Sequence, residues 1–387
     1  DKAKNDIVEL NADYKLSPSL TLSSQTSFNH DFLYSAEDYN RFNTAPGIFI
    51  SPQIITDERV GLISDSGMYC DPQLGCSDRL VAEDLSDEHA WQAGQEFRLA
   101  SDFAGPFNFS IGGNYLHYET EENYYVFINL LTLYAANYPF AGQNGGSDPQ
   151  FAWVPGVSDN RECLMGYQGS PGYPSSIGEG GLNYGNPNST NLDGCIYIDP
   201  NPISNLNNEG HNYFLSQNPY VLNSYAGFGE VYYNLLHDLK LTAGLRWTDD
   251  QKHFLQIPSW LIVPSSWGYP VEGVVDQKWN QLTGRLNATW TPKLNFTDQS
   301  LFYGSYAHGY KAGGANPPGA IFIGGSPTPV HPLTFKPEFV DAFELGTKNT
   351  LLDGGLTLNG DVFFYNYKGY QISEIVDRTS INLNFDA

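Results

Sequence analysis

The sequence predicts an all-β protein, a transmembrane antiparallel β-barrel with short turns on one side of the membrane and long loops on the other. Apolar and polar residues alternate along segments of about ten residues, a length that crosses a bilayer as a tilted strand. Short and long connections also alternate along the chain, and aromatic residues reach 14% beside only 16% charged residues. We therefore expect strands with one face toward lipid and the other toward a polar lumen.

The first two hairpins share this pattern. They are expected to pair Asp6–Tyr14 with Leu20–Phe28, and Ala90–Ala100 with Phe107–Tyr118. In each strand, apolar residues occupy every second position, and a short turn rich in Ser, Pro or Gly separates the two strands. Strict alternation on both sides of a short turn is typical of a β-hairpin.

The third and fourth hairpins repeat it. They are expected to pair Asn223–Asn234 with Leu239–Thr248, and Lys278–Trp290 with Leu301–Tyr310. Leu239–Thr248 has the cleanest alternation, with Leu, Leu, Ala, Leu and Trp on one face and Lys, Thr, Gly, Arg and Thr on the other.

The next hairpin runs from Phe339 to Thr347 and resumes at Leu356, after the turn Asn349–Gly355. An eleventh strand is expected at Thr379–Phe385. Three rings fall on the second face of the strand that starts at Leu356, and we expect them to form an aromatic girdle at the membrane interface. These rings are Phe363, Tyr365 and Tyr367.

Two long segments, about 30–89 and 119–222, lose the alternation and predict extracellular loops. Connections of this length are unusual in a compact soluble domain and are usually functional where they occur. A soluble β-sandwich or propeller also alternates, but loops this long fit it poorly.

Composition excludes other classes. No run of eighteen apolar residues occurs, which excludes a helical membrane span. The net charge of −24 argues against nucleic acid as a partner, because proteins that bind it carry a basic surface. The same acidity argues mildly against a strongly anionic ligand.

All four cysteines lie in the two long loops, which suits an oxidising compartment. Four cysteines allow three connectivities, and we favour the pairing of residues close in sequence, Cys70 with Cys76 and Cys163 with Cys195. A metal site is the alternative, but no CxxC spacing and no nearby histidine support it. We expect neither a metal nor a cofactor.

No catalytic motif is present, and no enzyme is expected. Adjacent carboxylates such as Glu121 and Glu122 point to opposite faces of a strand, so they cannot act together on one substrate. Isolated histidines are usually solvent-facing or hydrogen-bonded.

Two sets of residues are candidates for binding. Charged residues expected on the polar face could guide a substrate or simply line a wet lumen: Glu96, Arg98, Glu230, Lys240, Arg246, Arg285 and Glu344. Loop aromatics could stack on a small-molecule ligand, such as an aryl-bearing ferric chelate or a sugar ring, or could pack the loops together. They are Trp153, Tyr167, Tyr184, Tyr197, Trp260, Trp267 and Tyr269.

Four segments resemble the barrel of TonB-dependent outer-membrane receptors. They are Trp91–Asp102, Tyr220–Lys252, Leu301–Asn316 and Phe335–Gln371. The Leu-Thr-Ala-Gly-Leu-Arg-Trp-Thr, Gly-Tyr-Lys-x-Gly-Gly and Pro-Glu…Glu-Leu-Gly-x-Lys runs carry the resemblance together. It covers the strands over most of the chain, whereas the long loops match no known pattern.

The resemblance implies a 22-stranded barrel, plugged by an N-terminal domain, in the outer membrane of a Gram-negative bacterium. Residues 1–387 show about ten strands, so we expect them to be part of one such barrel domain, with the plug before Asp1 and further strands after Ala387. Outer-membrane lipid, lipopolysaccharide and the TonB complex are the implied partners.

The implied function is TonB-dependent uptake of a scarce nutrient, and family frequency favours a ferric siderophore as the cargo. The alternatives are an oligosaccharide or another organic nutrient taken up in the same way, and a passive porin. A secreted protein that binds or cleaves glycans is the least favoured.

Overall fold

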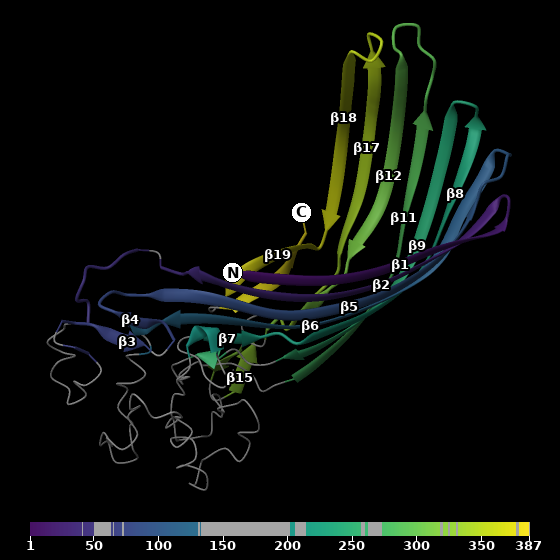
Figure 1. Cartoon of the computed structure of the whole chain (residues 1–387). Helices are drawn as coiled ribbons and strands as arrows, with labels where there is room; N and C mark the ends of the chain where they lie inside the picture. The colour runs from purple at the N-terminus through teal and green to yellow at the C-terminus, as the bar shows by residue number, and fades with distance from the viewer. Residues whose placement is uncertain are drawn as a thin grey trace.

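The structure of this chain is a computed structural model, shown in Figure 1. It describes residues 1–40, 42–49, 63–64, 66–71, 73–130, 132, 202–205, 214–256, 260–261, 273–317, 320–323, 326–329, 332–376 and 379–386. Long antiparallel strands form one curved wall, and shorter hairpins lie at one end of it (Figure 1).

Ten long strands follow one another across the main sheet in the order in which they occur in the chain. They are β1 (Lys2–Ser17), β2 (Leu20–Asp38), β5 (Ala82–Ser101), β6 (Phe107–Ile128), β8 (Tyr220–Leu236), β9 (Leu239–Gln256), β11 (Gly273–Trp290), β12 (Gln299–Lys311), β17 (Glu338–Leu351) and β18 (Leu356–Lys368). Two short strands attach beside this path, β7 (Phe214–Gln217) and β10 (Trp260–Leu261). All neighbours are antiparallel, as the predicted barrel requires.

Small hairpins lie on the loop side. They are β3 (Tyr69–Asp71) with β4 (Gly75–Ser77), β13 (Gly314–Ala315) with β16 (Thr334–Phe335), β14 (Ala320–Ile323) with β15 (Ser326–Pro329), and β19 (Tyr370–Val376) with β20 (Thr379–Phe385). A 3-10 turn, η3, covers Ile203–Asn205. The predicted strand Thr379–Phe385 is confirmed as β20, although it pairs with β19 and not with the main sheet.

The predicted hairpins are confirmed, but several strands reach further on the loop side than the alternation indicated. β2 continues to Asp38, β5 begins at Ala82 and β6 continues to Ile128, so the connections are shorter than the predicted segments 30–89 and 119–222. Beyond the bilayer both faces of a strand meet polar surroundings. The period of two then disappears from the sequence, although the backbone ladder continues.

Successive residues of a strand point to opposite faces of the wall, so residues at every second position, which have the same parity, share one face. Leu245 on β9 is 62% exposed and Leu345 on β17 is 64% exposed, whereas the intervening positions carry polar residues. Exposed apolar side chains share this outer face on all of the long strands except β12: Val8, Leu10, Phe28, Phe97, Ile111, Tyr225, Val231, Trp247, Leu282, Leu286, Phe343, Val362 and Phe364. A continuous apolar surface of this extent fits contact with lipid, since the ladder satisfies the backbone groups that lipid cannot.

The buried apolar residues lie near the loop-side ends of the strands and not inside the wall. Leu85 of β5 packs with Tyr125 and Phe127 of β6, and each is at most 2% exposed. A second cluster joins Phe49 to Tyr69 on β3. A one-sheet wall has lipid on one side and the lumen on the other, so a protein core can form only where the loops fold back on the strands.

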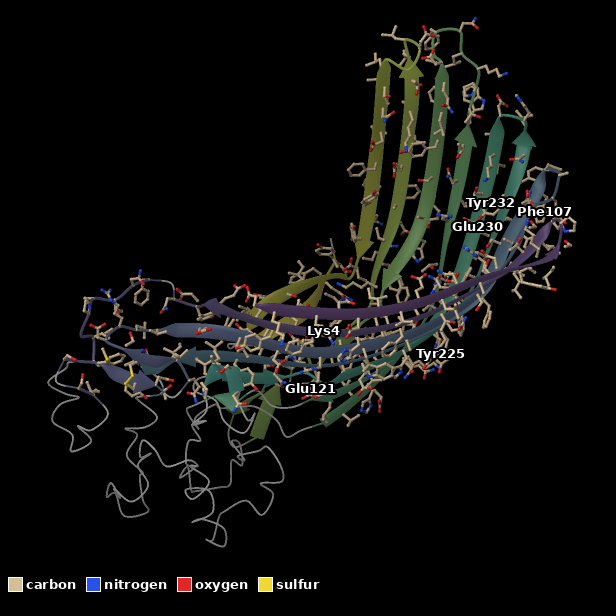
Figure 2. All side chains as sticks on the ribbon, viewed as in Figure 1. Lys4, Phe107, Glu121, Tyr225, Glu230 and Tyr232 are labelled. Carbon is tan, nitrogen blue, oxygen red and sulfur yellow. A yellow bond between two sulfur atoms is a disulfide. The ribbon has the colours of Figure 1, made fainter. Side chains whose placement is uncertain are left out.

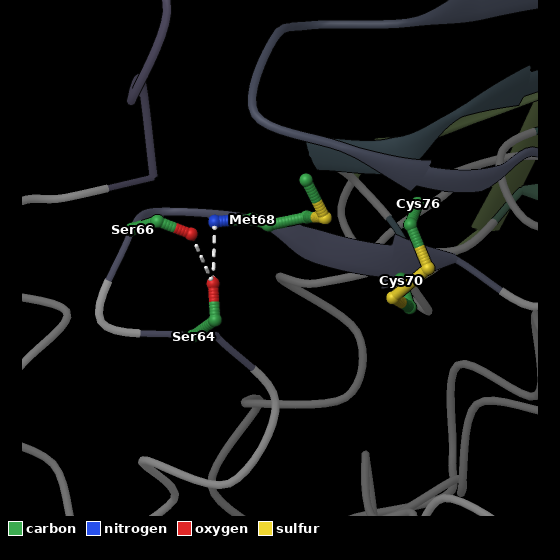
Figure 3. The surroundings of a disulfide bond; sticks show 5 residues. All are labelled: Ser64, Ser66, Met68, Cys70 and Cys76. Carbon is green, nitrogen blue, oxygen red and sulfur yellow. Dashed lines mark hydrogen bonds between the residues drawn. A yellow bond between two sulfur atoms is a disulfide. The ribbon is translucent and has the colours of Figure 1, made fainter.

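The β3–β4 hairpin is closed by a disulfide between Cys70 and Cys76, which lie directly opposite each other (Figure 3). This pairing confirms the prediction for these two cysteines. Cys163 and Cys195 lie outside the described residues. Close by, the Ser64 hydroxyl accepts a hydrogen bond from the Met68 backbone N–H at 3.1 Å.

Within the described ranges, no helix is both long enough and apolar enough to cross a membrane.

An arginine on the outer face is expected to destabilise the wall. Leu245→Arg would place a charge in the apolar band and reduce the free energy of unfolding in lipid vesicles by about 2–4 kcal/mol. The control is Ser305→Arg, because Ser305 faces the lumen opposite Glu344. Urea titrations would measure both variants, and equal losses would contradict the assignment of the faces.

Candidate functional site

The candidate site is the inner face of the wall. All seven charged residues expected on the polar face lie there, on the opposite parity to the exposed apolar residues: Glu96, Arg98, Glu230, Lys240, Arg246, Arg285 and Glu344. Their role in binding stays a prediction.

The strongest contact of this face is an ion pair that crosses a strand. Arg285 of β11 donates through Nε to Oε1 of Glu230 at 2.6 Å and through Nη2 to Oε2 at 3.0 Å. Gly244 of β9 lies between the two residues in register. A Cβ at Gly244 would lie 3.2 Å from Glu230 Oε1, so the missing side chain leaves the space through which this pair meets.

Two further residues extend this contact (Figure 2 labels Glu230 and Tyr232). The Tyr232 hydroxyl donates to Glu230 Oε2 at 2.7 Å, and the ammonium of Lys240 lies 4.6 Å from the centre of the Tyr232 ring. Glu230 is 17% exposed at its side chain, whereas Arg285 is 63% exposed. The guanidinium therefore remains accessible from the lumen while its partner is largely covered.

Arg246 makes a second cross-strand contact. Its Nη2 donates to Asn114 Oδ1 of β6 at 3.1 Å, and its Nε donates to Thr248 Oγ1 at 3.2 Å. The guanidinium also lies 5.8 Å from the centre of the Phe228 ring on β8. This arginine thus links β9 to β6 across the strand between them.

Glu344 accepts a hydrogen bond from the Tyr303 hydroxyl. Gly346 makes room for this ring, because a Cβ there would lie 2.6 Å from Tyr303 atoms. Glu96 and Arg98 form no salt bridge with the residues that the structure describes; Arg98 is exposed and Glu96 is half-buried.

Almost all of the predicted aromatic set lies outside the described residues: Trp153, Tyr167, Tyr184, Tyr197, Trp267 and Tyr269. Trp260 is in β10, where its backbone pairs with Leu215 of β7. Their contact with a ligand stays a prediction.

The three rings expected on the second face of β18 form a row on its inner face, which sequence reasoning did not offer as a binding surface. Phe363 lies opposite Glu344, and Tyr365 and Tyr367 share its parity. The expected interfacial girdle is therefore wrong for these three residues, because that girdle belongs to the lipid-facing side. Their face, which the alternation predicts to be that of Asp361, is confirmed. Phe363 and Tyr365 are 65% and 44% exposed, with ring centres 5.1 Å apart.

Beyond the apolar band the inner face is acidic. Glu88 of β5 and Glu122 of β6 lie directly opposite each other. Burial raises the pKa of the Glu122 carboxyl above its ordinary value, and the charge of Glu88 raises it further. Like charges in directly opposed positions destabilise a sheet, so this pair weakens the loop-side end when ionised.

Among the residues with described positions, no group of His, Cys, Asp or Glu is arranged to hold a metal ion.

A one-sheet antiparallel wall with an apolar outer face and a polar, ion-paired inner face defines a transmembrane β-barrel protein. The chain belongs to the TonB-dependent receptor-like β-barrel family, whose model matches residues 1–386. The family indicates a β-barrel of the Gram-negative outer membrane, and its members are transporters and receptors.

Two solved structures share the fold. The ferric yersiniabactin uptake receptor FyuA from Yersinia pestis is similar with a TM-score of 0.51 and 12% identity, covering 96% of this chain and 37% of that one. The copper transporter OprC is similar with a TM-score of 0.50 and 10% identity, covering 99% of this chain and 42% of that one. This chain therefore spans about two fifths of their length. A comparison with curated proteins gave no match.

A double-mutant cycle would measure the Glu230–Arg285 pair. We expect a coupling of about 0.2–1 kcal/mol between Glu230→Gln and Arg285→Met, because the guanidinium is mostly exposed and solvent screens the pair. Urea unfolding of the two single variants, the double variant and the wild type gives this coupling. Strict additivity would show that the pair contributes nothing to stability.

Glu122→Gln is expected to increase stability near neutral pH. The raised pKa means that the folded state binds the proton more readily than the unfolded state, whose value is near 4.5. The ionised Glu122 carboxylate therefore destabilises the folded state fully at a pH above its pKa in that state. The free energy of unfolding rises as the pH falls through this pKa and the carboxyl becomes protonated. The variant removes the penalty and this pH dependence.

Unfolding free energies at about pH 8 and about pH 5 would test this expectation. The control is Glu119→Gln, on the outer face of the same strand, where Glu119 lies 3.8 Å from His117. A loss of stability in Glu122→Gln at the higher pH would contradict the assignment of the penalty.

Proposed function

We propose that this chain forms part of the wall of an outer-membrane importer that takes up a scarce nutrient with energy from the TonB complex. The observation that carries the proposal is the two-faced wall: apolar residues cover its outer face, and ion-paired and aromatic residues cover its inner face. Membership of the TonB-dependent receptor family supports an energy-coupled route over passive diffusion.

A ferric siderophore is the proposed cargo. One structural relative is named for ferric yersiniabactin uptake and another for copper transport, and both names favour a metal-bearing cargo. The loop rings, among them Trp153 and Trp267, are the proposed contacts for an aryl-bearing chelate, because aromatic faces stack on planar groups. Residues 1–387 are proposed as part of one barrel domain of 22 strands. Other parts of the protein would supply the strands that close the barrel and the plug that fills its lumen.

An oligosaccharide is the second candidate cargo. Phe363, Tyr365 and Tyr367 form a row along the inner face of β18, and sugar rings stack on such aromatic surfaces. The same row could contact an aryl chelate, so measurements of uptake distinguish the two cargoes.

Growth of a strain that lacks the protein would test both cargoes. We expect this strain to grow poorly under iron limitation with a ferric siderophore as the iron source, and normally on defined oligosaccharides. Returning the gene for the protein is expected to restore growth only when the TonB complex is intact. Normal iron-limited growth with a defect on an oligosaccharide would replace the siderophore by the second candidate. Rescue without the TonB complex would reject energy-coupled uptake and favour a passive pore.

Two matched variants would locate the path. Phe363→Ala combined with Tyr365→Ala removes rings from the inner face, and we expect cargo uptake to fall about tenfold, since each stacking contact is worth about 0.5–1.5 kcal/mol. Phe343→Ala combined with Phe364→Ala removes rings of similar size from the outer face and is expected to leave uptake unchanged. An equal fall in uptake in both double variants would contradict a specific role of the aromatic row in transport.

A further inference from the structure

The chain that follows β12 folds back over the inner face of β9 and β11. Lys252 of β9 and Gln277 of β11 lie directly opposite each other, and Lys252 has the strand parity of Arg246. The Lys252 ammonium donates to the Gly313 carbonyl at 2.7 Å, and the Gln277 amide donates to the Gly314 carbonyl at 3.1 Å. Two neighbouring side chains of the wall therefore hold two successive carbonyl groups of the loop.

A second pair of opposed residues makes contacts two positions nearer the apolar band. Asp250 of β9 lies opposite Trp279 of β11. The Tyr310 hydroxyl at the end of β12 donates to the Asp250 carboxylate. The Trp279 ring lies against Gly313, where a Cβ would be only 2.7 Å from a ring carbon. The chain can lie this close to the wall because glycine has no side chain.

These contacts cross a part of the wall where β11 and β12 no longer pair. The ladder between the two strands ends at Gly284 and His308. Beyond that point β11 continues to pair with β9 as far as Gly273, and β12 continues to pair with β17 as far as Lys311. The loop therefore depends on side-chain contacts for its position over β9 and β11, and these can break while every strand of the wall stays paired.

A buried amide joins this loop to the β19–β20 hairpin. Asn316 is 1% exposed, and its Nδ2 donates to the carbonyls of Pro332 at 2.8 Å and of Asn382 at 3.0 Å. Its Oδ1 accepts from the Asn382 backbone N–H at 2.8 Å. One side chain thus connects the first arm of the loop to the second arm and to β20.

Two further amides connect the same three segments. Asn384 of β20 accepts from the Lys336 backbone N–H at 2.7 Å and donates to the carbonyls of Lys336 at 2.9 Å and of Gly369 at 2.8 Å. Gln371 of β19 donates to the Ala312 carbonyl at 3.1 Å and to the Lys336 carbonyl at 3.0 Å. Gly369 has a φ of +62°, and from there β19 turns away from the direction of β18 (Figure 1). We call residues 312–316, residues 332–336 and the β19–β20 hairpin together the cap.

The position of the cap over the wall also has a cost. Trp279 Nε1 and Gln277 Oε1 are buried beneath it and have no hydrogen-bond partner among the described residues. A buried donor or acceptor without a partner destabilises the state that buries it, and both atoms would reach water if the cap lifted. This cost opposes the contacts of Lys252, so the loss of one such contact is expected to shift the balance toward an open position.

We propose that the cap is a single conformational unit that opens and closes over the inner face of β9 and β11, and that Lys252, Gln277 and Asp250 form the latch that holds it closed. The three amides make the loop and the hairpin move together, since each one bonds backbone groups of more than one segment. This inference is independent of the cargo and of the TonB complex.

Hydroxyl-radical footprinting of the full-length protein in lipid nanodiscs would test the latch. We expect Lys252→Met to raise the labelling of Trp279 about tenfold, the ratio that follows from the loss of one hydrogen bond to a charged group. Lys252→Arg is expected to keep Trp279 protected, because it retains a charged donor. The control is Lys348→Met on the same face, since Lys348 lies 6.0 Å from the centre of the Tyr303 ring and not beneath the cap. Unchanged Trp279 labelling in Lys252→Met, or an equal rise in the control, would overturn the latch.

Hydrogen exchange measured by mass spectrometry would test whether the cap is one unit. We expect Asn384→Ala to accelerate exchange about tenfold in residues 312–316, although the hydrogen bonds of Asn384 go to Lys336 and Gly369. In the same way, Asn316→Ala is expected to accelerate exchange in β19.

The matched control is Asn349→Ala. The Asn349 amide donates to the Thr347 hydroxyl and to the Leu358 carbonyl near the short turn, so exchange in the cap is expected to stay unchanged. Faster exchange confined to the residues that the altered amide bonds directly would show that the loop and the hairpin move separately, and would reject the single unit.

Discussion

The backbone hydrogen-bond ladder is the constraint on which the rest of the structure depends. Lipid offers no partner for an N–H or C=O group, so each strand in the bilayer must pair along its length with its neighbours. An antiparallel ladder fixes the side to which each residue points, and a slip of one residue would exchange Leu245 with Arg246. Within the apolar band, the sorting of apolar residues outward and of Arg246 and Arg285 inward follows directly from this pairing.

Glycines turn the inner face from a set of separate strands into a connected surface. Gly244 leaves the space through which Arg285 reaches Glu230, and Gly346 accommodates the Tyr303 ring beside Glu344. Each contact joins side chains from different strands without a side chain between them. Such contacts connect the strands through their side chains in a part of the wall where the described residues form no buried apolar cluster.

The wall changes character along the strand direction. Within the apolar band, lipid and lumen impose opposite polarities on the two faces. Beyond this band, ion pairs such as Lys278–Asp249 and His308–Asp341 lie on the outer face. Further out, Leu85, Tyr125 and Phe127 form a small core, and Glu88 opposes Glu122 across the ladder. Each long strand therefore contacts lipid in its apolar part, and the small core and the acidic pair lie nearer its loop-side end.

The sequence by itself determined the fold class, the face of the seven charged residues expected in the lumen and the ends of strands at the short turns. Leu20, Phe107, Leu239 and Leu356 were predicted as first residues and begin β2, β6, β9 and β18. These three results depend on local information, since neighbouring residues alone set a period of two and a turn. The tertiary structure decided which charges meet, such as Glu230 with Arg285 across β9, and how far the strands extend beyond the bilayer. Those features depend on the register between strands, and alternation within one strand does not encode that register.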